Sequence, residues 1–536
     1  MTQMADTIIT NAKVFTADPA LPRAEAVAIR GNRLIFVGSE AAAHDLRTRR
    51  TKMIDGQGGT LLPGFIDSHF HLLSGSLQLD DIQLGQVTSL PELTEAVTRC
   101  AASQADRAWL VGSGLRYDVL PPETPLTRHH LDALVADRPL ALLAYDLHTA
   151  WANTEALLQA GLLGESEPVA PNSEIVRDAS GLATGELRER GAYDPLLDQI
   201  PPPTEAQKYE LLHQGLAQAA AFGITSIHNM DGNAAQLARY AALDEVGELT
   251  LRIYCPVDIV PATPPEALLE AVAMQQMCRG DKVRSGCVKF FMDGVVENFT
   301  AYLLDDYAGQ PGRRGGTLYS PEHFTRMATE ADALGLQIFV HAVGDGAVRQ
   351  TLDGFAAVRR ANGPRDSRHR IEHIELIHPD DLPRFAELDV IASMQPDHAI
   401  PNIDDTDPWP RLVSPSRWAC AFAWQAIKQA GARLVFGSDW PVVGQNPLDG
   451  LHITRNRRPW AKGLPDQRLS LGEALLAYTR EAAYAEFQEH QKGQLAPGML
   501  ADMVLLSADL FATPDEAINQ VRPVLTMCDG RVVYER

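Results

Sequence analysis

Residues 60–69, TLLPGFIDSH, are the first of eight short runs rich in β-branched and aromatic residues, and these runs decide the fold. The other seven are ITSIHNM (224–230), LRIYCPV (251–257), CVKFFMD (287–293), QIFVHAV (337–343), RIEHIE (370–375), VIASMQP (390–396) and RLVFGSD (433–439). Helical patterns such as PEHFTRMATEADALG lie between most of them and end near a glycine, as helices often do. Alternating strands and helices predict a parallel α/β architecture, and eight such units predict a closed (β/α)8 TIM barrel.

The two ends of the chain have an all-β pattern instead. EAVAIRGNRLIFVGSE near the N-terminus contains the turn signal Gly31-Asn32, and RPVLTMCDGRVVYER near the C-terminus contains Asp529-Gly530. Because a two-stranded piece alone is marginally stable, we expect the ends to combine into one small composite β-sandwich of residues 1–60 and 490–536. The barrel domain then spans residues 61–489.

A long gap separates the first and second predicted strands. Residues 75–205 far exceed an ordinary connection from a barrel strand to the next helix, so we expect an insertion with structure of its own. It contains the strand-like run PLALLAY and the helical run WANTEALLQAG, and it ends at three consecutive prolines. An insertion after the first barrel strand is predicted to cover the active-site face.

The composition is that of a globular protein and excludes several partners. Lys plus Arg number 47 against 69 for Asp plus Glu, a net charge of −22, and no basic run compensates locally. Such a chain repels phosphate backbones and anionic headgroups, so we expect neither nucleic-acid nor membrane binding. The six cysteines include no C-x-x-C pair, which argues against a disulfide framework and a thiolate zinc site. Neither a signal peptide nor a long apolar stretch is evident, so we expect a soluble, cytoplasmic protein.

Polar residues occupy the C-terminal ends of the predicted strands, where barrel enzymes carry their functional groups. The candidates are His69, His71, Lys289, His341, His373 and Asp439. The His-x-His pair places both imidazoles on one side of its strand. Each residue alone also has a structural interpretation: Asp439 could cap the turn in GSDWP, and Lys289 could form an ion pair with Asp293. Together they favour a metal site of imidazole and carboxylate ligands.

The same motifs resemble a known family. LLPGFIDSHFHL, VKFFMDG, HAVGD, RIEHIE, SMQPDH and FGSDWPV are together similar to the amidohydrolase superfamily, and specifically to its amidohydrolase family 3 branch. GQLAPGMLADMVLLS is similar to the C-terminal sandwich strands of that superfamily, and LHTAWANTEAL and GLATGEL in the insertion also match. The resemblance therefore covers nearly the whole chain.

The resemblance implies a ligand set. His69, His71 and Asp439 would bind the more buried metal ion, and His341 and His373 the second. Lys289 would be N-carboxylated and bridge the two ions, which agrees with the repulsion between a lysine ammonium and divalent cations. If Lys289 is instead unmodified, the site would hold a single ion. We expect one or two divalent ions, with zinc as the first candidate.

The implied activity is hydrolysis of a non-peptide C–N bond of amide type in a small molecule. Metal-activated hydroxide would attack the carbonyl carbon, and Asp439 would carry the proton to the leaving nitrogen. Candidates for the oxyanion donor or for substrate contacts are Asn229, Tyr145, His148 and His398. The two histidines could equally make structural hydrogen bonds. Relatives in this branch include N-substituted formamide deformylases, so a formamide or simple amide is the expected substrate.

Two long loops follow the fourth and seventh predicted strands. The segment 297–317 carries several glycines and is predicted to be a movable lid. The segment 397–418 contains Trp409 and Trp418, which either supply an apolar wall for a substrate side group or only bury the loop. With the insertion, these loops predict a large pocket and a substrate with a hydrophobic substituent.

Two other functions compete with this hypothesis. Deaminases on the same scaffold typically place His-x-x-Glu after the fifth strand, but here His341 is followed by Ala342-Val343-Gly344, which disfavours deamination. A catalytically inactive scaffold protein is the second alternative. Such proteins usually lose metal ligands, whereas this sequence has all six candidates. The oligomeric state is left open, with a homodimer as one possibility.

Overall fold

The computed structural model describes residues 3–103, 107–121, 123–164, 169–170, 173–277, 280–399 and 408–536. Its largest sheet has eight parallel strands in the order β21-β20-β19-β18-β17-β16-β15-β8. Their bounds are β8 (Phe65–Phe70), β15 (Ile224–Asn229), β16 (Arg252–Ile259), β17 (Val283–Phe291), β18 (Gln337–Ala342), β19 (Arg370–His373), β20 (Ile391–Met394) and β21 (Leu434–Phe436). All eight predicted runs contribute a strand, so the predicted α/β barrel is confirmed.

Backbone contacts after β21 close the barrel against β8. Phe70 and Trp440 form a parallel bridge, and the Asp439 amide donates to the His69 carbonyl at 2.7 Å. The two chains approach so closely that a Cβ on Gly437 would lie 2.3 Å from the His69 nitrogen. Glycine is therefore required at the seam that brings Asp439 beside the His-x-His motif.

Helices surround the barrel strands. They are α2 (Leu72–Gln78), α7 (Glu205–Ala221), α8 (Ala234–Glu245), α9 (Leu268–Met277), α10 (Pro321–Ala333), α11 (Asp345–Asn362), α12 (Leu382–Glu387), α13 (Pro408–Leu412), α14 (Trp424–Gln429), α15 (Pro447–Asn456), α16 (Leu471–Ala477) and α17 (Arg480–Ala485). Short 3-10 turns cover Pro265–Ala267, Pro379–Asp381, Pro396–His398, Pro415–Cys420 and Asp515–Gln520. Several of the α-helices begin at a side-chain cap; the capping box of Thr204 at the start of α7 is an example. None of the described helices is long and apolar enough to cross a membrane.

Two further sheets pack face to face: the first comes from the N-terminal segment alone, and the second combines strands from both ends of the chain. One has the order β5-β4-β1-β6 and the other β24-β23-β22-β7-β2-β3. The elements are β1 (Thr7–Thr10), β2 (Lys13–Phe15), β3 (Arg23–Ala24), β4 (Ala26–Arg30), β5 (Arg33–Gly38), α1 (Glu40–His44), β6 (Lys52–Asp55), β7 (Thr60–Pro63), β22 (Met503–Leu506), β23 (Pro523–Cys528) and β24 (Arg531–Glu535). Apolar side chains from both sheets, among them Ile9 and Leu505, share one buried core.

The single strand predicted at residues 60–69 corresponds to two strands in the structure. Thr60–Pro63 is β7, which pairs with β2 and β22 in the sandwich, and the first barrel strand begins only at Phe65. Both strands are fully buried, so the hydrophobic pattern runs through Gly64 without a break. The predicted strand at 60–69 is thus corrected to two strands in different sheets.

The long insertion forms a third unit with its own six-stranded sheet, in the order β13-β14-β12-β11-β10-β9. Its elements are β9 (Ile82–Gln83), α3 (Leu90–Ser103), β10 (Leu110–Leu115), α4 (Arg128–Leu134), β11 (Leu140–Ala144), β12 (Thr149–Ala152), α5 (Thr154–Gln159), β13 (Glu174–Arg177), β14 (Ala183–Arg188) and α6 (Arg190–Leu197). The run WANTEALLQAG starts as strand and becomes helix only after the Asn153 cap, which corrects the all-helical prediction.

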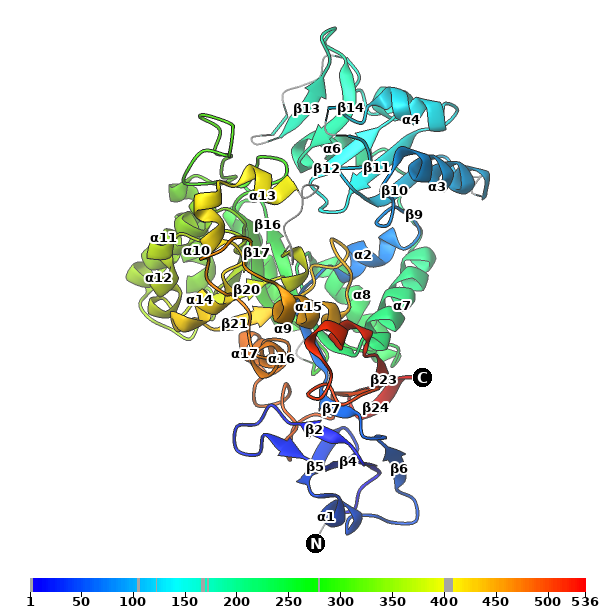
Figure 1. The fold of residues 1–536 in the computed structure, drawn as a ribbon, viewed down its shortest axis with the longest axis vertical. Helices are drawn as coiled ribbons and strands as arrows, with labels where there is room; N and C mark the ends of the chain where they lie inside the picture. Colours follow the sequence, from blue (N-terminus) through cyan, green and yellow to red (C-terminus); the bar gives the residue numbers. More distant parts are fainter. Residues whose placement is uncertain are drawn as a thin grey trace.

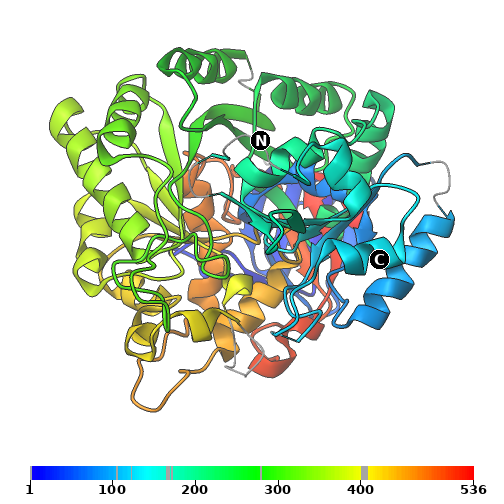
Figure 2. The ribbon, with the colours of Figure 1, turned by 90° about the horizontal axis from the view of Figure 1, so that it is seen from above.

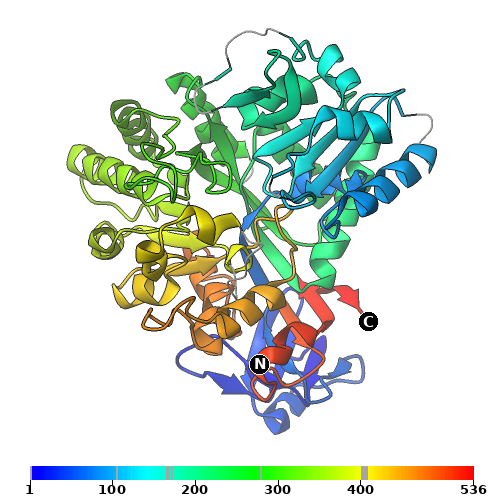
Figure 3. The ribbon, with the colours of Figure 1, turned by 45° about the horizontal axis from the view of Figure 1, so that its top comes forward.

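The three units lie along the long axis of the molecule (Figure 1). The cyan insertion lies at one end of the barrel and the blue and red sandwich at the other, as the tilted view also shows (Figure 3). Seen from above, the insertion lies in front of one side of the barrel, beside the ring of green and yellow helices (Figure 2). The insertion therefore stands over the barrel end that is remote from the sandwich.

Candidate metal centre

Three predicted ligands meet at the seam of the barrel. His69 is in β8, His71 caps α2, and Asp439 follows β21. Asp439 Oδ1 lies 3.2 Å from His69 Nε2 and 3.1 Å from His71 Nε2. The backbone of Asp439 has φ 66°, a strained conformation of the kind that clusters at functional sites. The three side chains can hold one metal ion.

A second group shares the same carboxylate. His373 Nδ1 lies 3.9 Å and His398 Nε2 3.6 Å from Asp439 Oδ2, and the two rings stack at 5.9 Å. Like Asp439, His373 has a positive φ, of 74°. His398, expected as a substrate contact, therefore joins a group of side chains able to hold an ion.

His341 lies at the edge of this cluster. Its ring centroid is 4.4 Å from that of His373, so the structure brings the predicted pair of the second ion together. His341 Nε2, however, lies 3.2 Å from the carbonyl oxygen of Gly294. Burial lowers the pKa of His341 well below its ordinary value, with Lys289 adding to the effect. The imidazole is thus neutral, as a metal ligand must be.

Lys289 is a fully buried amine in β17. Among the residues that the structure describes, its Nζ has no hydrogen-bond partner, and it lies 5.0 Å from the Phe291 ring centroid. Asp293, the alternative ion-pair partner, accepts instead from the amides of Val343, Gly344 and Tyr302 at 2.8–3.0 Å, so that interpretation is wrong. Burial lowers the pKa of Lys289 and thereby favours the neutral amine. An unpartnered neutral amine is the form that reacts with carbon dioxide.

The electrostatics of the cluster fit a cation. Burial would raise the pKa of Asp439, but His69, His71 and His373 outweigh burial and hold that pKa well below its ordinary value. Burial likewise opposes protonation of His71, yet Asp231 and Asp439 raise its pKa to about 9. A proton is thus held where a divalent ion would replace it. Imidazole nitrogens with carboxylate oxygen form a donor set suited to zinc and similar ions.

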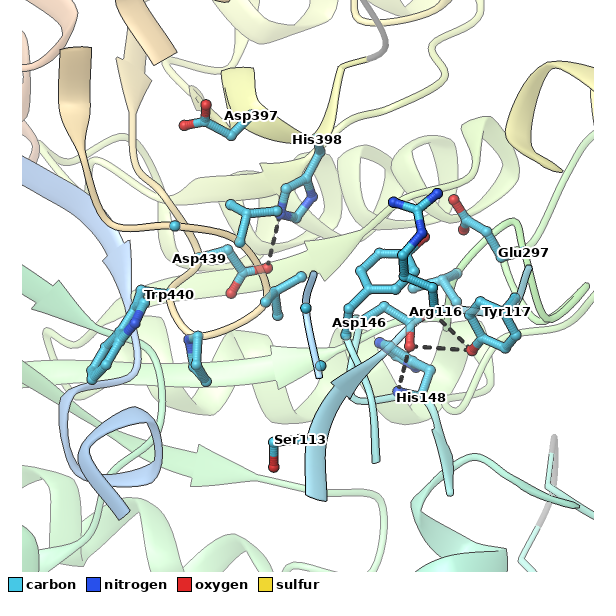
Figure 4. Close-up of a pocket in the computed structure, with 18 of the residues that line it drawn as sticks. Ser113, Arg116, Tyr117, Asp146, His148, Glu297, Asp397, His398, Asp439 and Trp440 are labelled. Atoms are coloured by element: carbon cyan, nitrogen blue, oxygen red, sulfur yellow. Dashed lines mark hydrogen bonds and ion pairs between the residues drawn. The ribbon is translucent and has the colours of Figure 1, made fainter. Parts of the chain in front are cut away.

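The cluster opens on a cavity of about 1050 Å³, drawn in Figure 4. Asp439 and His398 lie on one side, and Tyr117, Asp146 and His148 of the insertion lie on the other. The insertion and the barrel loops thus enclose the site jointly. Tyr145, another predicted contact residue, also lines this cavity.

Comparison with known proteins identifies the family. The sequence model of the amidohydrolase family matches residues 52–534. The chain belongs to the amidohydrolase family. Protein LONG AFTER FAR-RED 3 of Arabidopsis thaliana is 32% identical over 548 aligned positions, covering 99% of this chain and 92% of that protein. The N-substituted formamide deformylase of Arthrobacter pascens is 26% identical, covering 100% of this chain and 99% of that protein.

A solved structure is similar to this amidohydrolase over most of its length. An uncharacterized metal-dependent hydrolase from Pyrococcus furiosus aligns with a TM-score of 0.71 and 26% identity, covering 92% of this chain and 97% of that one. The predicted family is therefore confirmed, and the protein is a hydrolase of a metal-dependent family with candidate ligand groups in place.

In this amidohydrolase the insertion places His148 at the cavity, and several hydrogen bonds restrict the position of this residue. His148 Nδ1 lies 2.8 Å from Glu189 Oε2, and the His148 carbonyl accepts from the Glu189 amide at 2.7 Å and from Asn298 Nδ2 at 3.1 Å. The ring centroid is 5.8 Å from that of His341. Burial would lower the pKa of His148, but Glu189 outweighs it and raises the pKa to about 9.

The structure places three candidates for the cavity wall in other contacts. Asn229 is fully buried, and its side chain accepts from the Leu72 amide at 2.9 Å, so it fixes the start of α2 and not a substrate. Trp409 Nε1 donates to Glu375 Oε2 at 2.7 Å beneath the surface, and Trp418 Nε1 donates to the Val413 carbonyl. One continuous apolar stretch of the cavity lining is formed by Trp440, Pro441, Val442 and Val443. Residues 400–407 of the second loop lie outside the described residues.

Sequence reasoning missed the carboxylates behind the histidines. Glu372 Oε2 lies 2.8 Å from His69 Nδ1, and Asp231 Oδ1 lies 3.6 Å from His71 Nδ1. Glu189 holds His148 in the same way. Asp231 follows the end of β15, a position that could have indicated a functional residue. Alternation along RIEHIE predicts Glu372 and His373 on opposite sides of a regular strand, which concealed the role of Glu372. The φ of 74° at His373 breaks that alternation, so both side chains lie beside His69.

Proposed function

We propose that this amidohydrolase cleaves a non-peptide C–N bond of amide type in a small molecule. The residues proposed to hold one or two divalent ions, with zinc as the first candidate, are His69, His71, Lys289, His341, His373 and Asp439. An ion held there supplies a Lewis acid and lowers the pKa of bound water. The observation that carries the proposal is the place of Asp439, a single carboxylate that faces four imidazoles and also lines the cavity.

The two oxygens of Asp439 support two roles. Oδ1 faces His69 and His71, whereas Oδ2 faces His373 and His398. Because its pKa is held low, the carboxylate is ionised and can accept a proton from the attacking water. It can then return that proton to the leaving nitrogen, as general acid–base catalysis requires.

We assign His148 as the donor to the substrate carbonyl oxygen. Its Nδ1 is committed to Glu189, which leaves Nε2 for the cavity that the residue lines. The Glu189 carboxylate holds the ring, and hydrogen bonds from the Glu189 amide and Asn298 hold the backbone carbonyl, so the donor is in place before substrate arrives. A preorganised donor aimed at the developing oxyanion typically contributes about 10²–10³-fold to kcat.

The cavity favours a substrate with an apolar substituent. Its volume of about 1050 Å³ is large for a simple amide, and Trp440, Pro441, Val442 and Val443 form an apolar wall next to Asp439. The Arthrobacter pascens relative is named for N-substituted formamides. N-substituted formamides with bulky apolar groups are therefore the first substrates to test.

The two alternatives find less support. Gly344 occupies the position of the deaminase Glu, three residues after His341. The next carboxylate, Asp345, accepts instead from the Leu304 amide at 3.0 Å and from Arg417. An inactive scaffold would not need buried imidazoles gathered around one ionised carboxylate.

A substrate panel tests the proposal. Protein of measured metal content is incubated with N-substituted formamides, acetamides, carbamates, lactams and amino-heterocycles, and amine, acid and ammonia are quantified. Amine release from an amide that ceases in Asp439→Asn with bound metal supports the proposal. Ammonia release from the heterocycles without amide cleavage would instead identify a deaminase.

A further inference from the structure

A chain of buried polar side chains crosses the barrel interior from the sandwich end to the metal centre. Its members are Lys492, Glu486, His228, Arg370 and Glu372, and it ends on His69. Each is at most 3% exposed. The cations of Lys492 and Arg370 compensate the carboxylates of Glu486 and Glu372 inside the barrel, with the His228 imidazole between them. None of these residues apart from His69 has a role in the proposed chemistry.

Arg370, in β19, is the centre of the chain and is held by residues of four other strands. Its NH2 donates to the Ser68 carbonyl in β8 and, at 3.0 Å, to Ser393 Oγ in β20. Its guanidinium lies 4.2 Å from the Phe339 ring centroid in β18. Its NH1 lies 2.6 Å from His228 Nδ1 in β15. These contacts leave the guanidinium one position.

The hydrogen-bonding chemistry fixes the proton on His228. A guanidinium only donates, so His228 Nδ1 must accept and its proton must be on Nε2. His228 Nε2 faces Glu486 Oε1 at 3.3 Å, and Lys492 Nζ lies 2.7 Å from the same oxygen. The far end of the chain is therefore consistent with a neutral imidazole beside Arg370.

The same reasoning fixes the proton on His69. Glu372 accepts from Arg370 Nε at 2.8 Å and from Arg370 NH2 at 3.1 Å, as an ionised carboxylate does. An ionised carboxylate only accepts, so the contact of 2.8 Å between Glu372 Oε2 and His69 Nδ1 places the proton on Nδ1. His69 Nε2 then carries the lone pair, and it faces Asp439 Oδ1 at 3.2 Å.

We propose that Arg370 and Glu372 are positioning residues that select the Nε2 lone pair of His69 for the metal before any ion is present. Arg370 fixes Glu372, Glu372 fixes the tautomer and the ring orientation of His69, and His228 with Glu486 supports Arg370 from the sandwich end. The proposal rests on His69 being a metal ligand, as in the proposed function. The alternative is that these residues only stabilise the barrel interior, in which case the same contacts would exist without any effect on metal affinity.

Metal affinity separates these two roles. In Glu372→Gln the side-chain NH2 must face either Arg370 or His69. Facing Arg370, it places one donor against another, which is unfavourable. Facing His69, it donates to Nδ1 and forces the imidazole proton onto Nε2. We expect the Kd of the metal-free protein for Zn²⁺, measured by competition with a chelator, to rise about 10–100-fold. The matched control is Asp332→Asn, which breaks a buried contact with His369 (3.1 Å) and an ion pair with the partly exposed Arg365 on the outer side of the barrel.

The outcomes are distinct. The control is expected to lower the thermal unfolding midpoint while leaving the Kd for Zn²⁺ unchanged. If Glu372→Gln lowers the midpoint in the same way and keeps the wild-type Kd, the network is only structural and the proposal is overturned. A third variant, His69→Ala, tests the ligand assignment itself: an unchanged Kd there would refute the proposed metal centre and not the network.

A measurement on the unmutated chain covers the case in which Glu372→Gln does not fold. Metal-free protein labelled with ¹⁵N-histidine reports each tautomer through its nitrogen chemical shifts, and the His69 signals are identified by their loss in His69→Gln. We expect Nδ1 to carry the proton and Nε2 to be unprotonated. A proton on Nε2 of His69 would overturn the proposal.

Discussion

Oδ1 of Asp439 lies 3.1 Å from Nε2 of His71, although 368 positions separate the two residues in the chain (439 − 71). The contact exists because the segment after β21 bridges to the end of β8 and closes the barrel. Closure of the fold and assembly of the centre are therefore the same structural event. Disruption of the seam is expected to remove metal binding together with barrel stability.

Metal removal is expected to abolish activity reversibly. Prolonged dialysis against a chelator should leave protein that regains activity with Zn²⁺ or another divalent transition metal. Because an ion that binds only the folded state stabilises it, the thermal unfolding midpoint should fall on removal and recover on addition. Elemental analysis checks the metal content, and full activity in protein shown to be metal-free would refute the metal-dependent mechanism.

Reconstitution is expected to depend on dissolved carbon dioxide. Lys289 is a buried amine whose Nζ has no hydrogen-bond partner among the described residues, and its lowered pKa favours the reactive neutral form. Metal added with bicarbonate should load two ions per chain, whereas metal added in carbon dioxide-free buffer should load about one. Equal loading in both buffers would show that Lys289 is not a carboxylated ligand.

Loss of the His148 donor is expected to affect kcat more than KM. We expect His148→Ala to lower kcat by about 10²–10³-fold with unchanged metal content, because the donor acts mainly on the transition state. Glu189→Gln should give a smaller loss, since the ring stays but its orientation is less restricted. The control is His213→Ala, which removes an exposed histidine paired with Glu248 at 2.9 Å on the outer surface. A rise in KM at constant kcat would assign His148 to substrate binding alone.

Protonation of His228 is expected to destabilise the protein in mild acid. Burial lowers its pKa to about 4, with Glu486 opposing and Arg370 assisting the shift. In the unfolded chain the pKa is near 6.5, so between pH 6.5 and 4 the unfolded state binds the proton and the folded state does not. Stability therefore falls with decreasing pH in this window, by about 3 kcal/mol.

The variant His228→Asn isolates this contribution. Asparagine keeps an acceptor for Arg370 but cannot titrate, so the variant should be less stable at pH 7 and lose less stability on acidification. Thermal unfolding midpoints of wild type and variant at pH 7 and pH 4.5 make the comparison. An equal drop in both proteins would mean that another group causes the acid sensitivity.

The barrel was predictable because its strands are local patterns. Runs such as QIFVHAV carry β-branched residues over a length that fits one buried strand, and helical patterns separate most of them. The split between β7 and β8 was not predictable, since Pro63, Gly64 and Phe65 are all buried and no polar residue marks the change of sheet.

The site was only partly predictable. Residues at strand ends, such as His69 and Asp439, have positions that follow from the barrel itself. Side-chain directions do not follow from it: Asn229 occupies a strand end but bonds to α2, and the buried Trp409 donates to Glu375 instead of lining the cavity. The pairing of His148 with Glu189 depends on the tertiary folding of the insertion, over 41 positions of sequence, and no local pattern indicates it.

The most direct test of the central claim is the turnover of Asp439→Asn at measured metal occupancy. Asparagine keeps the shape and one oxygen of the side chain, so metal affinity should fall only moderately, whereas the proton shuttle is lost. We expect kcat on a cleaved amide to fall by about 10²–10⁴-fold or more at saturating substrate and full occupancy. Near-wild-type kcat in fully metal-loaded Asp439→Asn would contradict the account.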